Sequence, residues 1–161
     1  MKLSIIVPAH NEEDNIVEVI KRIEDSVLIE HELVVVNDHS TDKTFELVEQ
    51  LAKVYKNLVL VDNKLEGGFA NTICTGFSCS SGELLVPVMA DLCDDLSTIQ
   101  AMYERINQGY DIVCGSRYIL GGKRIGGSKL KGFLSSFAGS SLHYLLGVPT
   151  SDIANAFKMY K

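Results

Sequence analysis

Three carboxylates lie within five positions of the chain, directly after an apolar stretch. Residues 88–95 have the sequence VMADLCDD, so Asp91, Asp94 and Asp95 follow an apolar run that ends at Ala90. Carboxylate oxygens are preferred ligands of hard divalent cations, and such a cation binds phosphate oxygens at the same time. The pattern therefore predicts a Mg²⁺ or Mn²⁺ site formed by Asp91 with Asp94 or Asp95. A solvated acidic turn that caps the next helix is the alternative.

Polar residues follow other predicted strands in the same way. They are residues 8–13 after the first strand, residues 38–42 after the second, and Ser116 with Arg117 after the fifth. Each group on its own could be a turn or a helix cap. In an open parallel sheet, however, the carboxyl ends of the strands form one edge, and ligands bind there. Together with the acidic segment, these groups predict a binding cleft at that edge.

Apolar periodicity predicts the elements that bring these groups to one edge. Short buried strands are expected at residues 3–7, 32–37, 58–61, 84–90 and 111–115. Helical spacing is expected from residue 12, with Asn11 as the N-cap, and again near residues 47–54, 67–79 and 97–107. Strands that alternate with helices in this way predict an α/β fold, in which a mostly parallel sheet forms the middle layer of an α/β/α arrangement.

The segment after residue 115 departs from this alternation. A basic loop rich in glycine comes first and is expected at the surface. Residues 130–146 then predict a helix that carries Phe133, Phe137, Leu142, Leu145 and Leu146. A helix that lies in a membrane interface has this composition, and so does a helix packed into a protein core.

Composition limits the compartment and the partners. The chain has 161 residues and a formal net charge of −6, which fits one domain over residues 1–161 and argues against nucleic acid as a partner. Cys74, Cys79, Cys93 and Cys114 show no CxxC spacing, so we expect reduced, buried thiols and a cytoplasmic protein. The sequence holds no stretch of the roughly 18 apolar residues that a membrane span requires.

The common phosphate-binding loops are missing from the sequence. Neither GxGxxG nor GxxxxGK[ST] occurs, and PAHNEE follows the first predicted strand instead. This also argues against a sugar nucleotidyltransferase, which would need a glycine-rich loop with a basic residue at that place. The acidic edge would repel a diphosphate by about 4 kcal/mol for two unit charges about 4 Å apart at an effective dielectric constant near 20. A divalent cation between them removes this repulsion.

Several segments resemble a known family in their order and spacing. They are IIVPAHNEEDNI, VVVNDHSTDKT, EGGFANTICTGFSCSSGELLVPVMADLCDD, DIVCGSRYILGG and GVPTSDIANAFKMYK, which together cover essentially the whole chain. The chain resembles the family 2 glycosyltransferases, and within them it is most similar to the polyprenyl-phosphate (dolichol-phosphate) mannosyl- and glucosyltransferases. The resemblance implies a GT-A fold that binds a nucleoside-diphosphate sugar.

The resemblance also implies roles for single residues. The nucleotide sugar would be bound by Pro8, Ala9, Asn11, Glu12, Asp38, Gly68, Ala90 and Asp91, with Asp38 reaching the base. Asp91 matches the second acid of the Asp-x-Asp metal motif, and Arg117 would bind the diphosphate or the acceptor phosphate; these two would be the catalytic residues. The basic residues Lys123, Arg124, Lys129 and Lys131 would meet an anionic acceptor, unless they form an ordinary solvated loop.

The implied activity is an inverting sugar transfer with Mg²⁺ or Mn²⁺ as cofactor. The donor would be of the GDP-mannose or UDP-glucose type, and the acceptor a polyprenyl phosphate at the cytoplasmic face of a membrane, as in glycan or cell-envelope synthesis. The chain departs from the family pattern in two ways. Met89 replaces the first acid of the metal motif, and the family's chains normally continue further, so this chain is expected to be a fragment. An inactive nucleotide-sugar-binding or scaffold domain is therefore the alternative.

Overall fold

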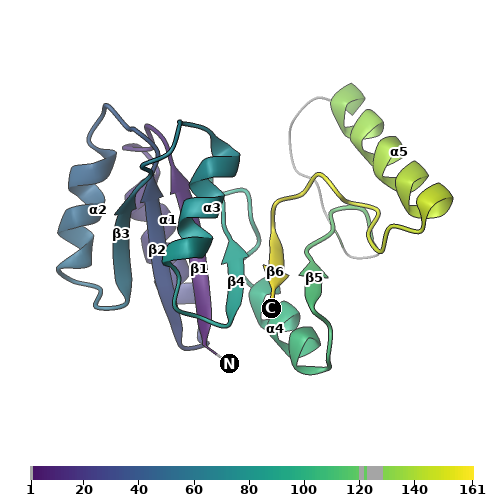
Figure 1. The fold of residues 1–161 in the computed structure, drawn as a ribbon, viewed down its shortest axis with the longest axis horizontal. Helices are drawn as coiled ribbons and strands as arrows, with labels where there is room; N and C mark the ends of the chain where they lie inside the picture. Colours follow the sequence, from purple (N-terminus) through teal and green to yellow (C-terminus); the bar gives the residue numbers. More distant parts are fainter. Residues whose placement is uncertain (1, 120–121, 123–128) are drawn as a thin grey trace.

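The fold is built on a six-stranded sheet with the strand order β3-β2-β1-β4-β6-β5 (Figure 1). The computed structural model describes residues 2–119, 122 and 129–161, without the side chains of residues 129–133 and 135. The strands are β1 (Leu3–Ala9), β2 (His31–Asn37), β3 (Leu58–Asp62), β4 (Leu84–Pro87), β5 (Ile112–Cys114) and β6 (Lys158–Tyr160). The helices are α1 (Ile16–Ser26), α2 (Thr44–Ala52), α3 (Phe69–Cys79), α4 (Thr98–Asn107) and α5 (Lys129–Leu146).

The sheet is mostly parallel, which confirms the predicted fold class. β1 pairs in parallel with β2 on one side and β4 on the other, and β3 continues the parallel order beyond β2. β6 is antiparallel to both of its neighbours, β4 and β5, so β5 runs in the same direction as β1. The carboxyl ends of β1, β2, β4 and β5 therefore lie at one edge of the sheet. The polar groups that follow these strands in the sequence predicted this arrangement.

The fourth strand is shorter than predicted. It ends at Pro87 instead of residue 90, although the Val88 N–H still donates to the Ile6 carbonyl over 2.8 Å. The next N–H group, on Met89, donates to the Asp94 side chain instead of to a neighbouring strand. The chain thus leaves the sheet just before the acidic segment, which turns back on itself.

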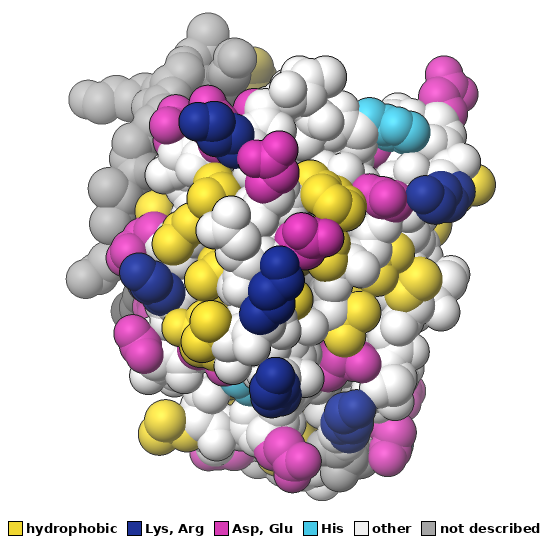
Figure 2. Space-filling view, turned by 90° about the vertical axis from the view of Figure 1, so that its left-hand side faces the viewer, with side chains coloured by type: hydrophobic (Ala, Val, Ile, Leu, Met, Phe, Trp, Pro, Cys, Tyr) yellow, Lys and Arg dark blue, Asp and Glu magenta, His cyan; other side chains and the backbone are white. Residues whose placement is uncertain are grey.

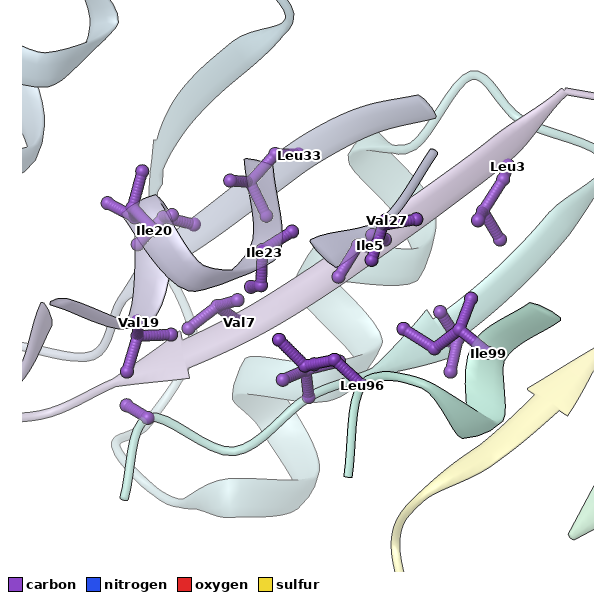
Figure 3. Packing of buried hydrophobic residues seen from close by; sticks show 14 of the residues in the cluster. Leu3, Ile5, Val7, Val19, Ile20, Ile23, Val27, Leu33, Leu96 and Ile99 are labelled. Atoms are coloured by element: carbon purple, nitrogen blue, oxygen red, sulfur yellow. The ribbon is translucent and has the colours of Figure 1, made fainter. Parts of the chain in front are cut away.

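One face of the sheet is covered by α1, α2 and α4 around the main hydrophobic core. Ile5 and Val7 of β1 face Val19 and Ile23 of α1, as Figure 3 shows. Each of these side chains is at most 2% exposed. Burial of such a side chain stabilises the fold by about 1.5–3 kcal/mol, so this face holds β1 firmly in the middle of the sheet.

The opposite face is covered by α3 at very short range. Ile6 of β1 and Val34 and Val36 of β2 form a second cluster beneath this helix, with Phe77 packed against it. A Cβ atom added to Gly76 would collide with the Ile6 side chain. Glycine at this position therefore lets the helix approach the sheet and completes the three-layer arrangement.

The start of α1 corrects the predicted helix cap. The helix begins at Ile16 with Asn15 at the N-cap, not at residue 12 after Asn11. Asn11 has a left-handed backbone conformation, with φ of 54°. Its side-chain oxygen accepts the Thr41 N–H over 2.8 Å. Asn11 is therefore engaged by the loop after β2 and does not cap the helix.

The expected burial of the cysteines is wrong. Cys74, Cys79 and Cys93 are exposed, and Cys114 is half-buried. The first two lie on α3, whose buried residues are Thr72 and Gly76. Apolar neighbours in the sequence therefore did not identify the buried side of this helix.

Helix α5 lies beyond β5 and β6, apart from the rest of the molecule (Figure 1). Its leucine and phenylalanine side chains are exposed where the structure describes them, from 38% for Leu142 to 80% for Leu145. Of the two alternatives that the sequence left open for this helix, packing into the core of the chain does not hold for those residues. Among the described residues, no helix has the length and hydropathy needed to cross a membrane.

The edge of the molecule formed by α2 and β3 has a mixed surface (Figure 2). Apolar side chains lie there among both acidic and basic ones. Val54, Val59 and Leu65, in or next to these two elements, are exposed. The described residues of this face form no continuous basic surface of the kind that binds nucleic acid.

Candidate functional site

The loops that follow β1 and β2 hold each other in place at the carboxyl edge of the sheet. The Asn11 N–H donates to Ser40 Oγ over 3.1 Å, and Asn11 Oδ1 accepts the Thr41 N–H. The Glu12 N–H donates to Thr44 Oγ1 over 2.8 Å. These hydrogen bonds join the two loops into one rim at the edge of the sheet and fix the backbone at Asn11 and Glu12.

Asp38 anchors a third loop to this rim. Its side chain is buried, with Oδ1 accepting from Asn63 Nδ2 over 2.7 Å and Oδ2 accepting the Gly68 N–H over 2.9 Å. Burial alone would raise the pKa of Asp38, but these hydrogen bonds outweigh it and hold the pKa below its ordinary value. Gly68, with φ of 140°, adopts a conformation that favours glycine. Contact between Asp38 and a nucleobase stays a prediction.

Asp91 and Asp94 lie in the short loop that follows β4. Asp91 is exposed, and its Oδ1 accepts the Cys93 N–H over 3.1 Å. Asp94 is half-buried, and its Oδ2 accepts the Met89 N–H over 2.8 Å. Each carboxylate thus has one oxygen bonded within the loop, and its other oxygen is not used by these bonds.

Asp95 has a different role in the structure. Its Oδ1 accepts both the N–H and the hydroxyl of Ser97, over 3.1 and 2.7 Å. Ser97 is the N-cap of α4, so Asp95 stabilises the start of this helix. This is the helix-capping role that the sequence left open for the acidic segment.

The charges around Asp94 show which groups share the edge. Burial raises the pKa of Asp94, the negative charge of Asp91 raises it further, and the positive charge of Arg117 partly offsets both. Asp94 is therefore close enough to both Asp91 and Arg117 to be affected by their charges. The structure brings together the acidic segment and the arginine that the sequence placed at the same edge.

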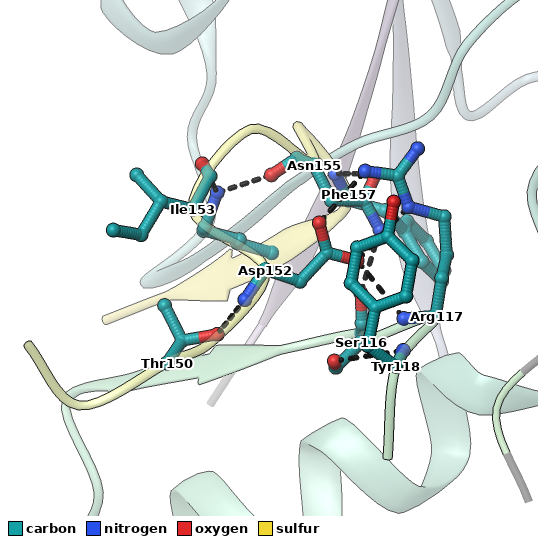
Figure 4. Close-up of polar contacts among 10 residues, drawn as sticks. Ser116, Arg117, Tyr118, Thr150, Asp152, Ile153, Asn155 and Phe157 are labelled. Carbon is teal, nitrogen blue, oxygen red and sulfur yellow. Dashed lines mark hydrogen bonds and ion pairs between the residues drawn. The ribbon is translucent and has the colours of Figure 1, made fainter. Parts of the chain in front are cut away.

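Arg117 is held by Asp152, a residue that was not among the predicted site residues (Figure 4). Arg117 Nε donates to Asp152 Oδ2 over 2.9 Å, and Nη2 donates to Oδ1 over 2.7 Å. The ion pair raises the pKa of Arg117, so its guanidinium stays charged. Burial alone would raise the pKa of Asp152, but the hydrogen bonds from Arg117 outweigh it and lower the pKa.

The other predicted site residues fall into two groups. Pro8, Ala9 and Ala90 are buried, and their contact with a nucleotide sugar stays a prediction. Lys123 and Arg124 lie outside the described residues, and so do the side chains of Lys129 and Lys131 in α5. Their contact with an anionic acceptor stays a prediction.

A separate depression of about 500 Å³ lies between β3 and α3. It is lined by Val61, Asp62, Lys64, Leu65, Cys74, Thr75, Ser78 and Cys79. None of the predicted site residues lines it, so it is distinct from the predicted cleft.

The acidic edge supplies some of the ligands that a hard divalent cation needs. Within the described part of the chain, no group of three or more His, Cys, Asp or Glu side chains is arranged to hold a metal ion. Asp91 and Asp94 nevertheless supply two carboxylates whose mutual repulsion a cation would relieve. Mg²⁺ is often bound by one or two carboxylates, with water and substrate phosphates as the remaining ligands. The residues present are compatible with that kind of site.

The sequence of the chain is similar to those of known proteins. Residues 4–161 match the model of the family described as "Glycosyl transferase family 2". The chain belongs to this family. A dolichol-phosphate mannosyltransferase from Pyrococcus furiosus is 38% identical over 124 residues. That alignment covers 76% of this chain and 35% of the relative, so the chain spans about a third of that family member's length.

Solved structures of other proteins share the fold. A mannosyltransferase from Pyrobaculum calidifontis, solved with GDP-Man and Mn²⁺, is 29% identical, with a TM-score of 0.57 over 63% of this chain and 31% of that one. A glucosyl-3-phosphoglycerate synthase from Mycobacterium tuberculosis is 19% identical, with a TM-score of 0.73 over 99% of this chain and 56% of that one. The GT-A fold expected from the sequence is confirmed by these likenesses.

Proposed function

We propose that the chain is the nucleotide-sugar-binding part of an inverting glycosyltransferase. The observation that carries the proposal is the placement of Asp91, Asp94 and Arg117 at one edge of the sheet in a family 2 chain. The Pyrobaculum calidifontis relative was solved with GDP-Man and Mn²⁺, which supports a similar donor and cation here. The donor would be a nucleoside-diphosphate sugar of the GDP-mannose or UDP-glucose type.

In this proposal, the chain's own residues bind and orient the donor. Asp91 and Asp94 would hold Mg²⁺ or Mn²⁺, which supplies positive charge to the leaving diphosphate when it is bound. Arg117 would donate hydrogen bonds to phosphate oxygens and in this way stabilise the negative charge that develops on them during transfer. The loops around Asn11, Glu12 and Asp38 would line the nucleoside pocket.

A thermal-shift panel of GDP- and UDP-sugars, each with and without Mn²⁺, tests this proposal. Ligand that binds only the folded state raises the melting temperature. We expect one donor to raise it, and the rise to need the cation. If no donor changes the melting temperature in the presence of Mn²⁺, the proposed function is wrong.

An inactive nucleotide-sugar-binding domain is the second candidate. Met89 in place of the first motif acid favours it, because the first carboxylate of the family's metal motif is then missing, although Asp94 and Asp95 keep the total number of carboxylates. Donor hydrolysis by the purified chain with Mn²⁺ separates the two functions. An active site releases sugar slowly to water, whereas an inactive domain binds the donor and releases none.

The acceptor in this proposal is a polyprenyl phosphate at a membrane surface. The name of the Pyrococcus furiosus relative points to a lipid phosphate, and the exposed apolar side chains Phe137, Leu145 and Leu146 of α5 are suited to an interface. We expect the chain to sediment with liposomes that contain anionic lipid. Replacing Leu145 and Leu146 by serine should abolish sedimentation, and unchanged sedimentation of that variant would refute this role of α5.

A further inference from the structure

The ion pair between Arg117 and Asp152 is unequally buried. The Asp152 side chain is 0% exposed, whereas that of Arg117 is 33% exposed. Asp152 binds Nε and Nη2 of the guanidinium, and its Oδ2 also accepts the Arg117 backbone N–H over 2.9 Å (Figure 4). One buried carboxylate therefore fixes both the backbone and the side chain of Arg117.

The guanidinium keeps donors that Asp152 does not use. An arginine side chain has five N–H groups, and the ion pair uses the one on Nε and one of the two on Nη2. The two on Nη1 and the second one on Nη2 remain for other partners. Arg117 follows β5, whose carboxyl end lies at the same edge of the sheet as that of β4, so these donors are at the edge that carries the acidic segment and can bind a phosphate group there.

Asp152 is itself held in a firm frame. Its N–H donates to Thr150 Oγ1 over 3.1 Å. The backbone of its neighbour Ser151 packs so closely on α5 that a Cβ atom at Gly139 would collide with the Ser151 carbonyl. These contacts fix the carboxylate, and through it the orientation of Arg117, without any ligand.

Orientation matters more than charge for this arginine. The charges of Arg117 and Asp152 cancel at a distance, so Arg117 can act on a phosphate mainly through short, directed hydrogen bonds. Such bonds depend on where the N–H groups point. A side chain that is already oriented also loses less conformational entropy when the ligand binds.

We propose that Asp152 is a positioning residue, which orients the Arg117 guanidinium toward the phosphate groups of a nucleoside diphosphate at the acidic edge. Asp152 is fully buried and so acts through Arg117, not by touching the ligand. This inference rests on the proposed function, because it assumes that the edge binds a diphosphate.

The test compares binding of GDP and of UDP, each with Mn²⁺, by isothermal titration calorimetry. The proteins are the unaltered chain, Asp152→Asn, Arg117→Ala and the double variant. We expect Asp152→Asn to weaken binding about tenfold, Arg117→Ala to do the same, and the double variant to bind no more weakly than Arg117→Ala. Glu24→Gln is the matched control, because it removes a carboxylate 3.4 Å from His31 in another largely buried pair and should leave binding unchanged.

Different outcomes overturn different claims. If the unaltered chain binds neither nucleotide, the proposed function fails, and the positioning role fails with it. If the unaltered chain binds and a folded Asp152→Asn variant binds equally well, only the positioning role is wrong. Effects of the two single variants that add in the double variant would also overturn it, since Asp152 would then act independently of Arg117.

A second variant keeps the test decisive if Asp152→Asn does not fold. Arg117→Lys retains a positive charge beside Asp152 but lacks the planar fork of N–H groups. We expect a melting temperature near that of the unaltered chain, with nucleotide binding nearly as weak as in Arg117→Ala. Binding by Arg117→Lys as strong as that of the unaltered chain would overturn the proposal, because orientation would then be irrelevant.

Discussion

At the scale of single residues, the acidic segment divides its carboxylates between two tasks. Asp94 is half-buried, accepts the Met89 N–H and feels the charges of both Asp91 and Arg117. Asp95 instead bonds Ser97 at the start of α4. The sequence left both residues open as the second metal ligand. The contacts favour Asp94, since its side chain is the one that faces the charged groups of the edge.

Paired amide variants test this assignment. We expect Asp94→Asn to weaken Mn²⁺ binding in the presence of nucleotide by a factor on the order of tens, because an anionic ligand is lost. Asp95→Asn keeps an oxygen that can accept from Ser97, so it should leave Mn²⁺ binding unchanged. Calorimetric titration of Mn²⁺ into both variants gives the comparison. A larger effect from Asp95→Asn would reverse the assignment.

Asp38 gives a prediction about pH. Its folded-state pKa lies below the value of about 3.9 in an unfolded chain, so its ionised form stabilises the fold above that pH. This stabilisation is lost as the pH falls through the folded-state pKa. We expect Asp38→Asn to lower the free energy of unfolding at pH 7 by about 1–3 kcal/mol. The difference should shrink below about pH 4, as measured by urea unfolding across a pH series. A difference that is independent of pH would contradict this.

The sequence pointed to those site residues that directly follow a strand. Asp91 comes immediately after the apolar segment that ends at Ala90, and Arg117 comes two residues after the strand predicted at residues 111–115, so their place at the edge could be predicted. Asp152 could not be found in this way, because it lies 35 residues from Arg117 and follows no predicted strand.

At the scale of elements, periodicity predicted the helices and the parallel strands, but not how β6 is inserted. This strand has three residues, and it lies between β4 and β5 in the sheet although it comes last in the chain. Its pairs join Met159 to Val113 and Tyr160 to Leu85. Such contacts between distant segments leave no periodic pattern in the strand itself.

The close approach of α3 to β1 makes Gly76 a sensitive position. We expect Gly76→Ala to destabilise the fold by about 1–3 kcal/mol, because the added methyl group collides with the Ile6 side chain. Alanine has a higher helix propensity than glycine, so without the collision this substitution would raise the free energy of unfolding. A decrease therefore points to the collision. Urea unfolding measures the change.

A double-mutant cycle with Ile6→Ala provides the control for this prediction. Removing the Ile6 side chain beyond Cβ creates room for the methyl group. Gly76→Ala should therefore cost less in the Ile6→Ala background than in the unaltered chain. Equal costs in the two backgrounds would show that the collision is not the cause.

At the scale of the whole molecule, burial decreases from the middle of the sheet toward β5. All seven residues of β1 are buried, whereas Ile112 of β5 is 54% exposed. We expect amide hydrogens of β1 and β2 to exchange with the slowest rates and those of β5 and β6 much faster. Hydrogen exchange followed by NMR checks this order. Equal protection of β1 and β5 would mean that the sheet opens as a single unit.

The central claim is that the carboxyl edge of the sheet binds a divalent cation and a nucleoside diphosphate together through Asp91. Electron paramagnetic resonance of free Mn²⁺, titrated with the chain and with GDP or UDP, measures this directly. Asp25→Asn, which changes an exposed residue of α1, is the matched control. We predict that nucleotide strengthens Mn²⁺ binding to the unaltered chain and to Asp25→Asn, and that Asp91→Asn removes this effect. Mn²⁺ binding by Asp91→Asn equal to that of the unaltered chain would contradict the claim.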